Sequence, residues 1–250
     1  MISIKNAEQL KLMRHAGRIT GEALRVAEEA IRPGISTKEL DGIIHRYIEK
    51  CGARPSFLGY GGFPGAACIS INNEVIHGIP SADRFLAEGD IVKVDVGACY
   101  KGYNGDAART FAVGSISPEA KRLVEATKES FYRGVAAALV GGRIGDIGSA
   151  VDSYAREFGY SVVRRYVGHG IGAELHEDPE VPNFGTAGRG ARLFAGMTIA
   201  IEPMVNAGGA DVRVLPNHWT VVTVDGSLSA HYENTVAILE NGPELLTDIP

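Results

Sequence analysis

A chain of 250 residues, 45% of them hydrophobic, is long enough for one large domain or two small ones around a sizeable core. A formal net charge of −5 and a pI of about 5.8 argue against nucleic acid or an acidic membrane surface as the main partner. Three cysteines without metal-finger spacing favour reduced thiols in a cytoplasmic protein over a disulfide framework. Neither a leader peptide nor a membrane-spanning segment is predicted.

Two helices are predicted at the start of the chain. Asn6 is the predicted N-cap of the first, with Gln9 three residues later, and apolar residues recur at helical spacing until Pro33. The second helix is predicted to begin after Ser36, where Glu39 completes a capping box. Its predicted buried stripe is Leu40, Ile43, Ile44, Tyr47 and Ile48.

Strand-like runs follow a glycine-rich loop, at 68–71 and 91–96, and helical periodicity returns after Ser117. The three glycines of 96–105 predict a broad hairpin connection that returns the chain close to Asp95. The spacing of Leu40, Ile44, Tyr47 and Gly52 recurs as Ile147, Val151, Tyr154 and Gly159. We therefore predict one catalytic domain, 1–250, of two pseudo-symmetric halves, about 1–114 and 115–250.

Four acidic residues, Asp95, Asp106, Glu202 and Glu233, lie at or beside the ends of apolar runs. An ionised carboxylate near a sheet core is tolerated only when it is paired or binds a metal. His169 stands between two glycines, which allow the backbone to approach a ligand closely. Four carboxylates balance two divalent ions, and this ligand set suits Mn, Co, Fe or Zn. The five residues predict a two-metal hydrolytic site.

The other histidines are not predicted to bind metal, because a lone histidine is more often a surface residue or a hydrogen-bonded core group. His77 and His176 are placed to form hydrogen bonds with a substrate. The remaining four are expected to have no special role: His15, His45, His218 and His231.

Several segments, in order and over almost the whole chain, resemble the type I methionine aminopeptidases. These segments are Asn73–Pro80, Asp95–Gly97, Asn104–Asp106, Gly168–Gly172, Ile201–Pro203 and Ala230–Glu233. The resemblance implies an α+β pita-bread fold, a curved antiparallel sheet flanked by helices with pseudo-twofold halves. The short interval between His169 and Glu202 and the early start of the catalytic segments are similar to the short bacterial form.

The resemblance implies a metalloaminopeptidase that removes the N-terminal methionine from nascent proteins and peptides with a small second residue. Two divalent ions would be bound, drawn from Co, Mn, Fe and Zn. Asp95 would bind one ion with both oxygens, and Asp106 and Glu233 would bridge the two. His169 and Glu202 would complete the other ion's shell. A water or hydroxide between the metals would attack the first peptide bond.

The resemblance also implies roles for the groups around the metals. Glu202 would shuttle protons, His176 would help stabilise the oxyanion, and His77 would contact the backbone at the scissile bond. Leu175 departs from the family pattern, in which phenylalanine is expected, so an aliphatic wall would loosen the pocket. The implied methionine pocket consists of Phe57, Tyr60, Phe63, Cys68 and Trp219.

Two alternatives use the same fold. Xaa-Pro peptidases share the five ligands, but they usually carry an additional N-terminal domain, and Asp95 comes early in this chain. Non-catalytic binding proteins of this fold tend to lose ligands, whereas all five are present. The implied partners are N-termini of nascent polypeptides, with transient ribosome association and a monomeric state, and neither nucleic acid nor a membrane.

Overall fold

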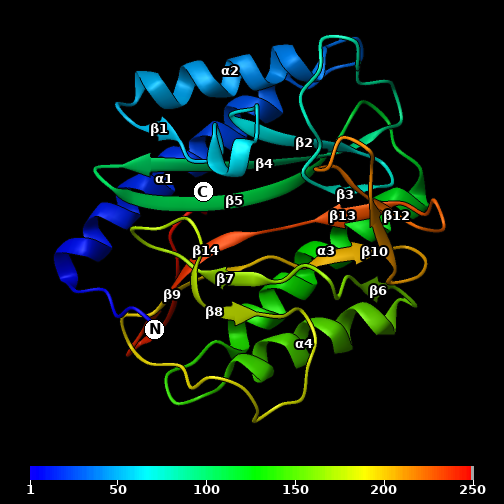
Figure 1. Ribbon diagram of the computed structural model, residues 1–250. Helices are drawn as coiled ribbons and strands as arrows, with labels where there is room; N and C mark the ends of the chain where they lie inside the picture. Colours follow the sequence, from blue (N-terminus) through cyan, green and yellow to red (C-terminus); the bar gives the residue numbers. More distant parts are fainter. Residues whose placement is uncertain (249–250) are drawn as a thin grey trace.

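The computed structural model describes residues 1–248 of the chain. Its helices lie in two pairs, one on each side of the strands (Figure 1). They are α1 (Ala7–Ala30), α2 (Thr37–Lys50), α3 (Pro118–Ala137) and α4 (Ile144–Glu157). None of the helices in residues 1–248 is long and apolar enough to cross a bilayer.

The strands form four short sheets, ordered β1-β4-β2 with β5 on β4, β13-β10-β6, β11-β12-β3 and β15-β14-β9-β7-β8. Their bounds are β1 (Arg54–Pro55), β2 (Ala67–Ile71), β3 (Glu74–Ile76), β4 (Ile91–Tyr100), β5 (Tyr103–Ala112), β6 (Ser161–Val162), β7 (Gly168–Gly170), β8 (Glu177–Val181), β9 (Thr198–Ile201), β10 (Met204–Asn206), β11 (Val212–Val214), β12 (Val221–Thr223), β13 (Ser229–His231), β14 (Asn234–Leu239) and β15 (Gly242–Leu245). All pairings among the described strands are antiparallel, which confirms the predicted α+β class.

The predicted helix starts are confirmed, with one difference at the second helix. The Asn6 side chain accepts a hydrogen bond from the Gln9 backbone N–H, and the Gln9 side chain accepts one from Asn6 N–H. Ser36 accepts from the backbone N–H of Glu39 at 3.1 Å, but the Glu39 carboxylate contacts Arg32 instead of closing the capping box. An exposed carboxylate beside a guanidinium gains a charge-assisted hydrogen bond there.

Two hydrophobic cores hold the helix pairs against the strands. The first joins α1 and α2 to β2, β4 and β5, and the second joins α3 and α4 to β9 and β14. The buried stripe of α2 includes Leu40, Ile44 and Ile48, whereas Ile43 and Tyr47 are only half-buried. In α4, Ile147 and Val151 occupy corresponding buried positions.

The broad connection predicted for 96–105 is wrong, because β4 and β5 form a hairpin with a tight turn. Both strands continue through this range, and the chain turns at Lys101 and Gly102, with φ values of 49° and 82°. Asp106 pairs with Gly97, two residues along β4 from Asp95. Paired residues and alternate residues face the same side of a sheet, so both carboxylates lie on one face.

Two glycines that the sequence pattern assigned to the turn serve close packing instead. A Cβ atom at Gly105 would lie 2.8 Å from the Cα atom of Gly17 in α1. At Gly97 it would lie 2.8 Å from the Phe57 ring. Glycine inside a strand allows such close approach of another segment. Helix α1 therefore lies directly against β5 at the residue before Asp106.

Candidate metal centre and substrate pocket

The five predicted metal ligands come from distant parts of the chain and line one cavity of about 150 Å³. Asp95 lies in the middle of β4 and Asp106 near the start of β5. His169 is the central residue of β7, Glu202 directly follows β9, and Glu233 directly precedes β14. Both hydrophobic cores thus support the site, because β4 and β5 belong to one and β9 and β14 to the other.

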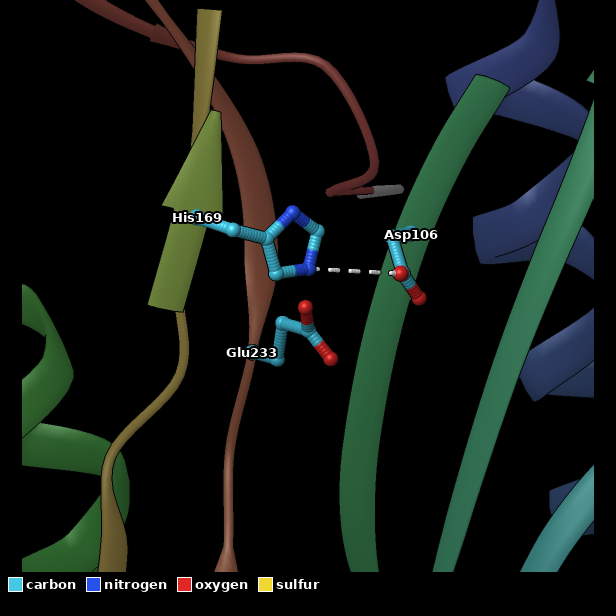
Figure 2. A group of neighbouring side chains, drawn as sticks. All are labelled: Asp106, His169 and Glu233. Atoms are coloured by element: carbon cyan, nitrogen blue, oxygen red, sulfur yellow. Dashed lines mark ion pairs between the residues drawn. The ribbon is translucent and has the colours of Figure 1, made fainter. Parts of the chain in front are cut away.

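The ligand atoms are spaced to share an ion. His169 Nε2 lies 3.9 Å from Asp106 Oδ2 and 3.6 Å from Glu202 Oε1. Asp106, His169 and Glu233 each offer a ligand atom within 4.8 Å of the others, and Figure 2 shows the three side chains pointing toward one another. Ligand atoms each about 2 Å from a common divalent ion lie up to about 4 Å apart, so the distances of 3.9 and 3.6 Å from His169 to Asp106 and Glu202 fit.

The carboxylates of this site lack the partners that burial demands. Asp95 Oδ1 and Asp106 Oδ1 are buried without a hydrogen-bond partner within residues 1–248. Burial raises the pKa of Asp106 to about 7. Burial first, and then neighbouring carboxylates, raise the pKa of Asp95, Glu202 and Glu233 well above the ordinary value. Cations would favour the ionised forms and supply the missing partners, so the residues fit a metal site.

His169 is oriented as a metal ligand by its own strand. Its Nδ1 lies 2.8 Å from the carbonyl oxygen of Gly170, which is the partner expected for an Nδ1–H donor. Nε2 then carries the lone pair and faces Asp106 and Glu202. Burial lowers the pKa of His169 to about 3, so the imidazole is neutral and able to bind a metal near pH 7.

His77 and His176 line the same cavity, as the sequence predicted for substrate-binding groups. His77 adopts a left-handed backbone conformation with φ of 59°, which is uncommon outside glycine and often found at functional sites. Burial, and then His176, lower the pKa of His77 to about 4. Burial also lowers the pKa of His176, whose ring centroid lies 4.1 Å from that of His169.

Part of the lining of this cavity is an apolar cluster. Phe63 and Trp219 meet edge to face with ring centroids 5.1 Å apart, and Leu175 is buried in the same wall. Burial raises the pKa of the Cys68 thiol, which keeps it protonated and apolar in character. All predicted pocket residues line the cavity together with Leu175: Phe57, Tyr60, Phe63, Cys68 and Trp219.

Comparison with known proteins shows the family of the chain. The model of metallopeptidase family M24 matches residues 11–240. The chain belongs to metallopeptidase family M24. A methionine aminopeptidase of Clostridium acetobutylicum is 59% identical over 247 residues, which cover 99% of each chain. The solved structure of a Thermotoga maritima methionine aminopeptidase matches with a TM-score of 0.98 and 44% identity, covering all of both chains.

These relatives confirm the resemblance to the type I enzymes and the pita-bread fold. The fold also extends to a prolidase of Pyrococcus furiosus, with a TM-score of 0.81 and 28% identity. The M24 chain covers only 66% of that prolidase, which is therefore the longer protein. The methionine aminopeptidases match over their full length and at higher identity.

The structure of this M24 peptidase also places His231 at the site, although the sequence pattern assigned this histidine no role. His231 is fully buried, and neither ring nitrogen has a hydrogen-bond partner in the described chain. Its Nε2 lies 3.7 Å from Glu202 Oε2 and 4.0 Å from Glu233 Oε2, so the expectation of an ordinary histidine is wrong. The available signal was its closeness in sequence to Glu233, which follows β13 two residues after His231.

Removal of metal is expected to make the stability of this M24 peptidase fall as the pH rises above about 6.5. The folded metal-free protein keeps carboxyl protons that the unfolded chain releases near pH 4. That stabilising contribution is lost as the pH rises through the folded pKa values, about 7 for Asp106. Buried histidines with lowered pKa values oppose this trend only below about pH 6.5, where the unfolded chain takes up protons.

A melting series from pH 6.5 to 8.5 tests this expectation. The Tm of metal-stripped protein should fall by about 5 °C or more, whereas protein loaded with a divalent ion should change much less. Asp106→Asn should reduce the fall in the stripped protein, because one titrating carboxylate is gone. A stripped protein whose Tm does not change over this range would contradict the charge balance inferred for the site.

Proposed function

We propose that this chain is a methionine aminopeptidase, which hydrolyses the first peptide bond of peptides and nascent proteins whose second residue is small. The observation that carries the proposal is that the five proposed ligands share one cavity with an apolar cluster that includes Phe63 and Leu175. A peptide would thus present its first carbonyl to the cluster and its first side chain to the apolar wall. The names of the full-length relatives support the same activity.

The residues that would hold the metals are Asp95, Asp106, His169, Glu202 and Glu233. Asp106, His169 and Glu233 offer ligand atoms within 4.8 Å of one another, and Asp95 and Glu202 line the same cavity. Two bound divalent ions would neutralise the carboxylates and make a water molecule acidic enough to react near pH 7. Co, Mn, Fe and Zn all suit this donor set.

The neighbouring side chains would bind the substrate and transfer protons. Glu202 would hold a proton on its carboxylate and pass it to the departing amine. His176 would donate a hydrogen bond to the carbonyl oxygen as negative charge develops there. His77 would hold the backbone at the scissile bond, while Phe63 and Trp219 contact the thioether side chain.

The proposal also concerns the setting of the enzyme. We regard residues 1–250 as one catalytic domain of two related halves, acting as a monomer in the cytoplasm, where new N-termini appear. The cysteines of the described chain are all free, which agrees with a reducing compartment. Transient association with the ribosome would bring the enzyme to its substrates.

The test is release of free methionine from Met-Ala-Ser by metal-stripped protein reloaded with Mn or Co. Release should require metal, and Leu-Ala-Ser should be cleaved much more slowly; the size of that difference measures how strict the pocket is with Leu175 in its wall. An Xaa-Pro dipeptide should not be cleaved. Cleavage of that dipeptide alone would move the chain to the proline-directed peptidases, and no cleavage by metal-loaded protein would contradict a peptidase function.

A further inference from the structure

Tyr60 makes a contact with His176 that none of the roles above uses. The Tyr60 hydroxyl oxygen lies 2.8 Å from Nδ1 of His176, and the two ring centroids are 5.2 Å apart. Burial, and then Glu174, raise the pKa of Tyr60, so the phenol keeps its proton. The hydroxyl is therefore able to act as a hydrogen-bond donor to the imidazole.

The direction of this hydrogen bond decides what His176 offers to a substrate. When the tyrosine O–H donates to Nδ1, the hydrogen of the imidazole must be on Nε2. When Nδ1–H donates to the tyrosine oxygen, a neutral ring has a bare lone pair on Nε2. A bare Nε2 would repel a carbonyl oxygen, whereas Nε2–H would donate to it. Only the first direction fits a group that stabilises an oxyanion.

Tyr60 is held in place by the segment that forms the apolar wall. The Tyr60 N–H donates to the Phe57 carbonyl at 3.0 Å, and the Phe63 N–H donates to the Tyr60 carbonyl at 2.9 Å. The Gly59 N–H donates to the Phe63 carbonyl at 2.9 Å and closes the loop. The Phe63 ring then packs edge to face on Trp219. The backbone of Tyr60 is thus fixed by the loop that carries Phe57 and Phe63, and its hydroxyl is held by the hydrogen bond to His176.

We propose that Tyr60 is a positioning residue, whose hydroxyl donates to Nδ1 of His176 and so presents Nε2–H to the scissile carbonyl. The proposal rests on the function proposed above, because it assigns a task to His176 in that reaction. One loop then performs two tasks: Phe57 and Phe63 contact the first side chain of the peptide, and Tyr60 orients the group that acts on the adjacent carbonyl. Side-chain recognition and carbonyl activation are joined through a single hydrogen bond.

Tyr60→Phe removes the hydroxyl and keeps the ring. We expect kcat for Met-Ala-Ser to fall about tenfold with KM nearly unchanged, since that factor corresponds to a hydrogen bond of ordinary strength. In a His176→Ala background the same substitution should have no further effect on kcat. Tyr103→Phe is the matched control: its hydroxyl accepts from Gln9 at 2.8 Å outside the cavity, and kcat should stay as in the parent.

Nitrogen-15 NMR of histidine-labelled protein loaded with diamagnetic Zn supplies a readout independent of activity. In the parent protein, His176 should show a protonated Nε2 and a hydrogen-bonded acceptor Nδ1, and Tyr60→Phe should shift Nδ1 only at this histidine. An Nδ1-protonated ring in the parent would overturn the proposal, as would a Tyr60→Phe effect on KM alone or an equal loss in the His176→Ala background. A parent protein that does not release methionine would contradict the proposed function instead, and the spectrum would still test the tautomer.

Discussion

Asp106→Asn is expected to lower methionine release by at least about 1,000-fold, because bound ions contribute several kcal/mol to such reactions and Asp106 is one of three residues whose ligand atoms lie within 4.8 Å of one another. Asp106 Oδ2 lies 3.9 Å from His169 Nε2, and its other oxygen is buried without a partner among residues 1–248. The amide keeps the shape of the side chain but removes the charge that two ions would share. Release of methionine and metal content by elemental analysis should fall together.

The control for this variant is Asp152→Asn, which removes a carboxylate that pairs with Arg156 on the outer helix α4. Activity and metal content should stay close to those of the parent. An Asp106→Asn protein with full activity, or one with two tightly bound ions and no activity, would show that Asp106 does not hold the metals as proposed.

His176→Ala is expected to retain the bound metals while kcat falls about 100-fold to 1,000-fold, the usual cost of removing one oxyanion donor. The imidazole lines the cavity, but its Nδ1 is engaged by Tyr60, and its ring lies at a tilt of 53° beside that of the proposed ligand His169. Loss of the ring therefore removes a substrate contact without removing a ligand. Single-turnover assays and metal analysis of the same sample separate the two effects.

His45→Ala on α2 is the control and should leave kcat unchanged, since His45 pairs with the exposed Glu49 one turn later and does not line the cavity. A His176→Ala protein that lost metal would contradict the proposal that His176 contacts the substrate and does not hold the metals. A large rise in KM without a fall in kcat would show that His176 binds the ground state rather than the developing oxyanion.

The chemistry of the site could be predicted because it depends on residue types that a sequence displays directly. A carboxylate such as Asp95 or Glu202 within an apolar run needs a cation wherever the fold puts it. The positions of the strand ends and turns were harder to predict. Glycines are common in turns, yet Gly97 and Gly105 lie inside paired strands. Phe57 approaches Gly97 closely, and α1 approaches Gly105. Local sequence does not distinguish a glycine needed for a turn from one needed for space.

The sequence brought the five proposed ligands together, but it did not predict individual contacts between other distant side chains. Tyr60 and His176 are 116 positions apart, and nothing near either residue indicates that their side chains meet. His231 was assigned no role because a single histidine carries little information, although it lies only two residues before the proposed ligand Glu233. Such contacts follow from the sheet order and its register, which are set by the whole chain.

The order of the ligands along the chain has a consequence for biosynthesis. Asp95 and Asp106 are translated in the first half of the chain, but Glu233 follows β13 and precedes β14, near the end of the described residues. An incomplete chain that stops before Glu233 has four of the five proposed ligands, and it also lacks β14, which pairs with β9. Capture of metal at the complete site thus depends on nearly complete synthesis, so truncated chains would neither bind the ions in the same way nor compete with the finished enzyme.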